Sequence, residues 1–499
     1  MSMDSRGKSI PDLSRLRMVF GLDRRGFVYL GPDIVYREVC ADGIEVLEYI
    51  IHRNLLCKLI ENGLVETQVV TMEPIPILKH EYTRFATTPA EWSPSMLKDV
   101  ALFLCRFNEV LSDYGLTLSD GHALNVTFRR GRPVLLDFGS ITFLSEMSNK
   151  GRPQDSTKKI RDFSLKIALR VGQRLPPIVK QWVGRHTPST LYSELRGLRK
   201  EVQGFHWLEE FRSRVLVPLW IASTGQKEVM TQFLRTEPRG LGYHLARTKW
   251  RRLPPWFYQI RRTLNREGWR QSLRVLEERI EGLSMPLDPD VWTTYTERYP
   301  EEKAAKYSVI LDALERSKPK TITDLGANIG ELPRRIVNQL DLPVCAVDVD
   351  IDCIEYLYRH IRGTGEQLQP AVLDVIFPNP STGSGTRRPG SVERFSAEMV
   401  LCLALVHHLV IRCGLSMKAF AAIIADYSLD SLIVEFVEPT DKHVQSWQRS
   451  GFRIPNDYSL DDFLKSFAKY FSSYSRLNDY HDTRSLYLFS GKISRKKLL

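Results

Sequence analysis

The stretch with the clearest chemistry is TITDLGANIG at residues 321–330, which is followed by VCAVDVD at 344–350. Gly326 lets the chain turn sharply off a first strand, and Gly330 allows close packing where a helix starts. Asp348 follows Gly326 by 22 positions, near the spacing of roughly 20 for an acid that accepts hydrogen bonds from ribose hydroxyls. The pattern therefore predicts a strand, a turn with exposed backbone amides, and an acid at the tip of the neighbouring strand, together facing a ribose-containing ligand.

This turn is looser than the dinucleotide motif, because GANIG stands where three glycines would be expected. A nicotinamide cofactor brings a pyrophosphate to the helix N-terminus and favours clean glycines there. S-adenosylmethionine has no pyrophosphate and tolerates DxGxNxG, in which Asn328 can adopt a left-handed conformation. The alternative is an ordinary turn without a ligand. We favour S-adenosylmethionine, and expect Asp324, Gly326, Asn328 and Gly330 to line its site with Asp348 on the ribose.

A second set of polar residues lies in LTLSDGHALNVTFRRGRPVLLDFGSI. Asp120 and Asn125 are five positions apart, and Asp137 of an Asp-Phe-Gly triplet follows twelve positions later. In kinase-like phosphotransferases one Asp orients the acceptor hydroxyl, while an Asn and a second Asp hold Mg²⁺ against the phosphates. The spacing therefore predicts a kinase-like unit in which these three residues are a remnant of a site for Mg-ATP.

The parts that precede this set are incomplete. There is no glycine-rich loop and no strand lysine of the VAIK type, and Lys58 and Lys79 are the candidates for that lysine. We therefore expect a degenerate kinase-like domain without turnover. The alternatives are an active kinase and a structural hairpin whose Asp and Asn residues cap turns.

The elements that position the first site form an alternating array of strands and helices toward the C-terminus. The predicted strands are 321–325, 343–348, 371–376, 398–406 and 431–439, followed by an antiparallel hairpin. The fourth strand is apolar throughout, as a strand buried on both faces requires. This predicts a seven-stranded Rossmann-like α/β sheet, preceded by an α+β N-terminal domain.

Length and composition indicate a globular chain of enzyme size with two or three domains, since it has 499 residues, 43% hydrophobic and 26% charged. The N-terminus does not resemble a secretory signal, no apolar run is long enough to span a membrane, and seven scattered cysteines indicate reduced thiols. We expect a cytoplasmic protein. The division predicted is 1–230 for the kinase-like domain, 231–290 for a basic helical linker, and 291–499 for the cofactor domain.

Much of the net charge of +11 lies in residues 235–279, with twelve Lys and Arg against four Asp and Glu. Apolar residues three to five apart predict an amphipathic helix over 258–283. An interdomain helix is the favoured interpretation. Contact with an anionic surface is the alternative, and nucleic acid is not an expected partner.

The run LCLALVHHL, followed by LIVEFVEPTDKHV, resembles a bacterial family of two-part S-adenosylmethionine-dependent methyltransferases related to rhizobial nodulation proteins. The resemblance extends back through EWSPSMLKDVALFL and FRSRVLVPLWIA, and so covers most of the chain. It implies a class I methyltransferase sheet, S-adenosylmethionine as cofactor, and Asp374 on the adenine amino group. The acceptor does not follow from it.

Methyl transfer is an in-line displacement, so positioning in a dry pocket supplies much of the catalysis. We expect a small-molecule or saccharide-like acceptor methylated at oxygen, without a metal. A hydroxyl acceptor benefits from a base, and His407 and His408 at the end of the fourth strand are the candidates, titrating near 6.5; Glu435 and Glu438 are second choices. The alternatives are a phosphotransferase coupled to methylation, and a non-catalytic scaffold that binds an anionic partner.

Overall fold

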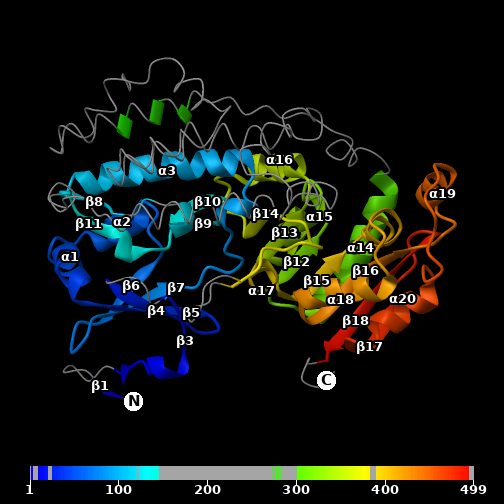
Figure 1. Ribbon diagram of the computed structural model, residues 1–499, viewed down its shortest axis with the longest axis horizontal. Helices are drawn as coiled ribbons and strands as arrows, with labels where there is room; N and C mark the ends of the chain where they lie inside the picture. Colours follow the sequence, from blue (N-terminus) through cyan, green and yellow to red (C-terminus); the bar gives the residue numbers. More distant parts are fainter. Residues whose placement is uncertain are drawn as a thin grey trace, which may run out of the picture.

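The computed structural model describes residues 2–3, 9–20, 25–119, 121, 123–144, helical positions within 273–281, 300–381 and 389–493. Apart from those helical positions, the basic segment 235–279 lies outside the described residues, as does Asp120. The described chain forms two halves that lie side by side (Figure 1).

The C-terminal half is built on a seven-stranded mixed sheet, in the order β14-β13-β12-β15-β16-β18-β17. Its parallel strands are β12 (Ile322–Leu325), β13 (Val344–Asp348), β14 (Leu368–Val372), β15 (Ala397–Cys402) and β16 (Ser428–Val437), and its antiparallel hairpin is β17 (Phe471–Arg476) with β18 (Arg484–Lys492). The predicted seven-stranded α/β sheet with a closing antiparallel hairpin is confirmed.

The third, fourth and fifth strands end earlier than predicted, at Val372, Cys402 and Val437. The third strand ends at Val372, and Asp374 lies beyond it, where its carboxylate accepts a hydrogen bond from the Ile376 amide at 2.9 Å and closes a turn. The fourth strand ends at Cys402, because Ala404 adopts a left-handed conformation with φ of 49°. The apolar residues that follow still enter the core, so hydrophobicity alone did not mark the end of the strand.

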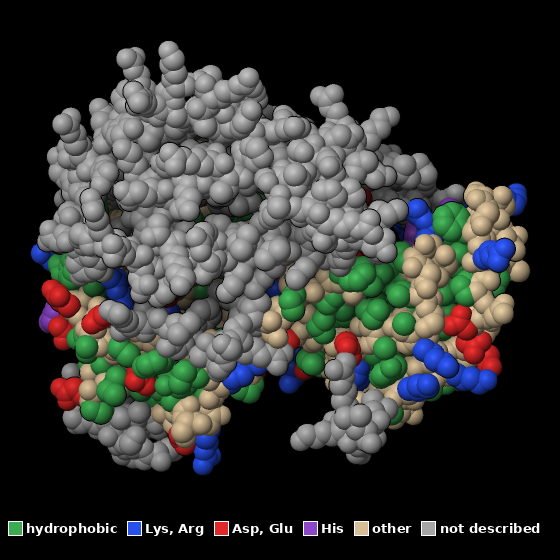
Figure 2. All heavy atoms as spheres, in the orientation of Figure 1, with side chains coloured by type: hydrophobic (Ala, Val, Ile, Leu, Met, Phe, Trp, Pro, Cys, Tyr) green, Lys and Arg blue, Asp and Glu red, His purple; other side chains and the backbone are tan. Residues whose placement is uncertain are grey.

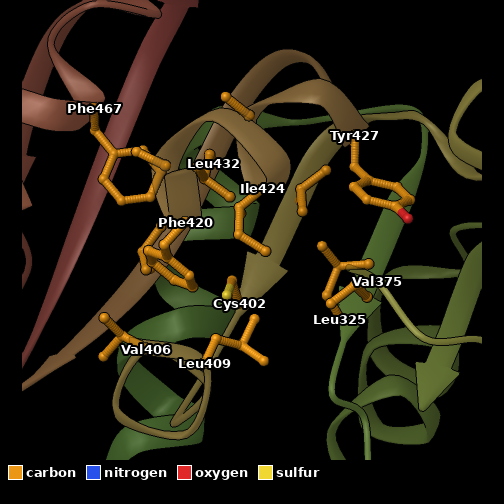
Figure 3. Packing of buried hydrophobic residues seen from close by; sticks show 14 of the residues in the cluster. Leu325, Val375, Cys402, Val406, Leu409, Phe420, Ile424, Tyr427, Leu432 and Phe467 are labelled. Carbon is orange, nitrogen blue, oxygen red and sulfur yellow. The ribbon is translucent and has the colours of Figure 1, made fainter. Parts of the chain in front are cut away.

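Helices cover both faces of this sheet, as a parallel sheet requires. One face carries α14 (Pro300–Ser317), α15 (Glu331–Leu340) and part of α16 (Ile351–Ile361), and the other carries α17 (Ser391–Phe395), α18 (Met417–Tyr427) and α20 (Leu460–Phe467). Figure 3 shows the second interface, where Phe420 and Ile424 of α18 pack over Leu432 and Cys402 of the sheet. Helix α19 (Lys442–Arg449) follows β16 at its carboxyl end.

The N-terminal half contains a five-stranded antiparallel sheet, in the order β3-β4-β5-β7-β6. Its strands are β3 (Arg17–Phe20), β4 (Gly26–Leu30), β5 (Ile34–Val39), β6 (Thr67–Thr71) and β7 (Ile77–Glu81), and its longer helices are α1 (Ala41–His52), α2 (Leu56–Glu61) and α3 (Pro94–Ser112). Two hairpin-like pairs follow, β9 (Val126–Arg129) with β10 (Arg132–Leu135), and β8 (Leu116–Leu118) with β11 (Ile141–Phe143). The kinase-like assignment of this α+β half stays a prediction.

The surface of the described residues mixes charges of both signs. In Figure 2 acidic and basic side chains lie beside one another over the region of α20 and β17, where Lys465 pairs with Asp461 at 2.5 Å and Arg476 pairs with Asp479 at 2.6 Å. None of the helices among the described residues has the length and apolar character needed to cross a membrane.

Candidate functional site

The turn after β12 has left-handed backbone at three positions, with φ of 81° at Gly326, 52° at Asn328 and 75° at Gly330. At Gly330 a β-carbon would lie 2.5 Å from the end of the Leu357 side chain on α16, and the positive φ strains any other residue, so glycine is strongly favoured there. The turn therefore brings the start of α15 and the body of α16 close together at the carboxyl edge of the sheet. Open α/β sheets bind their ligands at this edge.

Asp348 ends β13 and faces this turn. Its Oδ2 accepts a hydrogen bond from the Asn328 amide at 2.8 Å, and its Oδ1 accepts one from the Asp350 amide at 2.9 Å. Asp350 in turn caps the N-terminus of α16 by accepting from the Asp352 amide at 2.8 Å. The predicted turn residues and the predicted ribose acid thus lie together, and two amides fix the orientation of the acid.

Asp324 lies on β12 beneath the turn and is only 3% exposed. Its Oδ1 has no hydrogen-bond partner within the described part of the chain. Burial and the nearby charge of Asp348 raise the pKa of Asp324 to about 7, and Lys306 on α14 only partly opposes this rise. Lys306 was not expected from the sequence. The sequence feature that could have indicated Lys306 is its position on the inward-facing side of the amphipathic helix α14.

Asp374 lies near Asp348 at the same sheet edge. The Leu373 amide donates to the Asp348 carbonyl at 2.8 Å, so the chain leaves β14 directly beside the predicted ribose acid. Asp324 on β12, Asp348 at the end of β13 and Asp374 just after β14 therefore belong to three neighbouring strands or the turn that follows one.

His407 and His408 follow β15, where the chain forms a π-helical turn over His408–Arg412. The His407 ring is 3% exposed, stacks on Trp447 of α19 at 5.1 Å between ring centroids, and has no partner at Nδ1 among the described residues. The ring of His408 lies 4.5 Å from that of His407. Leu405, two residues before His407, is the loop residue that approaches Gly326.

Both imidazoles are weaker bases than expected. Burial, with the neighbouring His408 and Arg484, lowers the pKa of His407 well below its ordinary value. Burial and Arg412 lower the pKa of His408 to about 4. The predicted titration near 6.5 is therefore wrong, because these rings are taken out of water beside positive charges.

Of the two reserve carboxylates, Glu435 is committed to a buried network. It accepts hydrogen bonds from Tyr480 and from Lys306 at 3.3 Å, and Arg484 lies 3.9 Å away. Burial alone would raise the pKa of Glu435, but Lys306 and Arg484 outweigh it and the pKa is lowered. Glu435 thus joins α14 to β16 as a paired carboxylate. The other reserve carboxylate, Glu438, has a pKa raised by burial.

In the N-terminal half the structure places a cation where the sequence suggested none. Arg37 on β5 donates to Asp137 Oδ1 at 2.5 Å, and the Gly139 amide donates to the same oxygen at 3.1 Å. Arg25 reaches the same region by donating to the carbonyls of Gly139, at 3.2 Å, and Ile141, at 3.0 Å. A small pocket lies between these groups and α1.

Of the two lysine candidates, Lys58 donates to the Tyr114 hydroxyl at 2.8 Å and Lys79 is exposed on β7. The sequence feature that could have indicated this cation is Arg37 within the strand sequence IVYREV. Asn125 ends a 3-10 turn and its carbonyl accepts from the Leu136 amide at 2.8 Å. The residues that the structure describes contain no group of three or more His, Cys, Asp or Glu side chains placed to hold a metal.

Comparison with known proteins supports a relationship to nodulation proteins. No family model matches the chain. The nodulation protein NoeA of Rhizobium meliloti (strain 1021) is 26% identical over 434 residues, which cover 83% of this chain and 81% of NoeA. The chain is similar to NoeA over most of its length. The predicted resemblance to rhizobial nodulation proteins is thereby confirmed, and similarity to NoeA over this share of the chain includes residues of both halves.

Three solved structures show weaker likeness than NoeA does. WbdD is 16% identical with a TM-score of 0.27, over 38% of this chain and 40% of WbdD, less than half of that chain. The N-methyltransferase NodS of Bradyrhizobium japonicum WM9, in complex with S-adenosyl-L-homocysteine, is 8% identical with a TM-score of 0.29. The match covers 40% of this chain and 93% of NodS. A putative O-methyltransferase of Nostoc punctiforme PCC 73102 is 12% identical with a TM-score of 0.31. The match covers 40% of this chain and 60% of that protein. At these scores no argument about activity rests on them.

Proposed function

We propose that the chain is an S-adenosylmethionine-dependent methyltransferase whose C-terminal half methylates a small-molecule or saccharide-like acceptor at oxygen. The observation that carries the proposal is the left-handed turn Gly326–Gly330, whose Asn328 amide donates to the Asp348 carboxylate at 2.8 Å. A turn of this kind at the carboxyl edge of a parallel sheet is a cofactor site without a pyrophosphate cradle. The relationship to NoeA supports the family and leaves the acceptor open.

The residues present fit this cofactor. Asp348 would accept from the ribose hydroxyls, and Asp374, at the end of the next strand, would accept from the adenine amino group. Asp324 offers a buried carboxylate oxygen without a hydrogen-bond partner in the described chain, which suits the ammonium group of the methionine end. When bound, the cofactor supplies an activated methyl group and its own leaving group.

The acceptor side would be formed at the ends of β15 and β16. His407 or His408 would accept the proton of the acceptor hydroxyl. Each ring is held against Trp447, and the ring that accepts the proton would be neutral beforehand. Because both rings have lowered pKa values, their strength as bases is limited, and alignment in a water-poor site would supply the larger share of the rate.

For the N-terminal half we propose a kinase-like unit that does not transfer phosphate. Mg²⁺ needs carboxylate oxygens as ligands, and Arg37 already pairs with Asp137 at 2.5 Å with its guanidinium almost fully buried. This pairing favours a degenerate unit without phosphate transfer over the alternative of a phosphotransferase coupled to methylation. The third alternative, a scaffold for an anionic partner, depends on residues 235–279, most of which lie outside the described chain.

Calorimetry on the full chain tests the proposal. We expect S-adenosylmethionine and S-adenosylhomocysteine to bind, and Asp348→Ala to weaken both, since charge-assisted hydrogen bonds contribute roughly 1.5–3 kcal/mol each. Asp312→Ala, on the exposed side of α14, is the matched control. Unchanged affinity in Asp348→Ala would contradict the ribose assignment, and a wild-type chain that binds neither ligand would contradict the function. Mass spectrometry of co-purified ligands would identify the acceptor.

A further inference from the structure

A carboxylate of the N-terminal half lies fully buried against the C-terminal half. Glu91 ends the short 3-10 turn Pro89–Glu91, where a reciprocal capping arrangement with Thr88 fixes its backbone. Its Oε1 accepts from Asn379 at 2.6 Å, from Ser391 at 2.6 Å, and from Arg394 at 2.5 Å. Its Oε2 accepts a second bond from Arg394 at 2.8 Å. One acidic side chain thus holds three residues of the other half.

These three residues flank the chain that follows the proposed adenine-binding residue. Asn379 lies five positions after Asp374, and its carbonyl accepts from the Ser391 amide at 2.9 Å. Ser391 starts α17, and Arg394 lies on it. Glu91 binds both Asn379 and Ser391, the two residues that this hydrogen bond joins. The chain that follows the Asp374 turn is therefore anchored to the N-terminal half.

A second anchor acts on α16, the helix that begins directly after Asp348 and Asp350. Glu355 of α16 accepts from the Ser95 amide at 2.8 Å and so caps the N-terminus of α3. Asp99 of α3 accepts from Tyr358 at 2.6 Å and from Arg362 at 2.5 Å. Figure 1 shows α3 and α16 lying side by side.

The two halves also exchange aromatic side chains. Tyr358 of α16 is fully buried in the N-terminal core, where its ring contacts Phe128 edge-to-face at 5.4 Å. Phe85 of the N-terminal half is 3% exposed within the C-terminal core that contains Leu373 and Val375. Phe85 has a left-handed backbone with φ of 57°, which is rare for a bulky residue and persists only where its surroundings hold it.

We propose that Glu91, with Ser95 and Asp99, forms a positioning device that holds the Asp374 turn and the start of α16 in their cofactor-binding geometry. The inference rests on the proposed function and extends it, because it makes the N-terminal half part of the cofactor site. None of these three residues needs to touch the cofactor. They act through Asn379 and Ser391 on one side, and through Glu355 and Tyr358 on the other.

The test compares full-length wild type, Glu91→Gln and Tyr358→Phe by S-adenosylhomocysteine calorimetry and by hydrogen exchange without ligand. We expect Glu91→Gln to weaken binding on the order of tenfold and to speed exchange in residues 373–379. Tyr358→Phe keeps the ring and removes one hydrogen bond to Asp99, so it should speed exchange in α16 with a smaller loss of affinity. Glu61→Gln, at an exposed position of α2, should match wild type in both measurements.

A double variant separates positioning from general stability. Glu91→Gln leaves the Arg394 guanidinium without its carboxylate partner, so adding Arg394→Gln should restore part of the affinity and of the protection. A folded Glu91→Gln protein with wild-type affinity and wild-type exchange would overturn the inference, even if its melting temperature were lower. If Glu91→Gln does not fold, Ser391→Ala takes its place, with the same two readouts and the same overturning result.

Failure of the proposed function gives a different result. If the wild-type chain does not bind S-adenosylhomocysteine, the function falls, and hydrogen exchange alone decides the positioning claim. Faster exchange in residues 373–379 of Glu91→Gln then supports it, and unchanged exchange refutes it.

Discussion

At the scale of single residues, Asp324 is the group whose titration has the largest consequence for the proposed site. Its pKa of about 7 in the folded chain lies well above the ordinary value for an aspartate. The folded state therefore holds this proton more tightly than the unfolded state does. The stabilising contribution is complete below the unfolded pKa and is lost as the pH rises through about 7.

We predict that Asp324→Asn is more stable than wild type at pH 8 and similar to it near pH 3, because the neutral amide carries no buried charge to lose. The difference at high pH should be on the order of 2–4 kcal/mol, measured by chemical denaturation across this range. Asp312→Asn, at an exposed position, is the control. A difference that stayed constant with pH would show that the buried acid does not titrate in this window.

The same carboxyl should make cofactor binding depend on pH. In the proposed site an ionised Asp324 would pair with the ammonium of S-adenosylhomocysteine, so affinity should increase as the pH rises from 6 to 8. Calorimetry at several pH values would detect this, and the increase should disappear in Asp324→Asn. A wild-type affinity that is flat over this range would remove Asp324 from the ammonium site.

The histidines lead to a third prediction. If His408 or His407 is the base for a hydroxyl acceptor, replacing it by Asn should lower turnover roughly 10²–10⁴-fold with little change in cofactor affinity. For His408 the acidic limb of the rate profile should lie near its pKa of about 4, because only the neutral ring accepts a proton. Two Asn variants with wild-type turnover would leave positioning as the source of catalysis.

At the scale of secondary-structure elements, strands β5 and β10 and the turn after β10 bring Arg37 onto Asp137, which lies 100 positions away in the sequence. We predict that Asp137→Asn leaves methyl transfer largely intact and destabilises the chain by roughly 1–3 kcal/mol, because a buried guanidinium loses its charged partner. Denaturation and a methyl-transfer assay on the same sample would measure both. Methyl transfer that required ATP would favour the phosphotransferase alternative.

The elements differ in how much the sequence could reveal about them. The turn at Gly326–Gly330 and the acid at Asp348 were predictable, because each depends on residues that are close in the sequence: the glycines that a left-handed turn needs, and the apolar residues of the strand before the acid. Arg37 with Asp137, Lys306 with Glu435, and Glu91 with Ser391 were not, because each pair forms only when distant elements pack. The end of β15 was missed for a related reason, since the loop beyond it is also buried and apolar.

At the scale of the whole molecule, the shared cores argue against an independent C-terminal half. We predict that a fragment of residues 291–499 unfolds at a lower temperature than the full chain and binds S-adenosylhomocysteine more weakly, because it loses Phe85 from its core and leaves Tyr358 exposed. Calorimetric scans of the fragment and of the full chain would measure this. A fragment with full-length stability and affinity would support the predicted division into autonomous domains.

The exchange of Phe85 and Tyr358 also has a consequence during synthesis. The N-terminal core up to Leu144 leaves the ribosome long before Tyr358, the residue that completes it. At translation rates of 5–20 residues per second the wait is roughly 10–40 s, far longer than the collapse of such a chain takes. Throughout this interval the place of the Tyr358 ring is empty and Phe85 has no core to enter. We therefore expect the nascent chain to expose apolar surface at these two places until the last third of the sequence has been made.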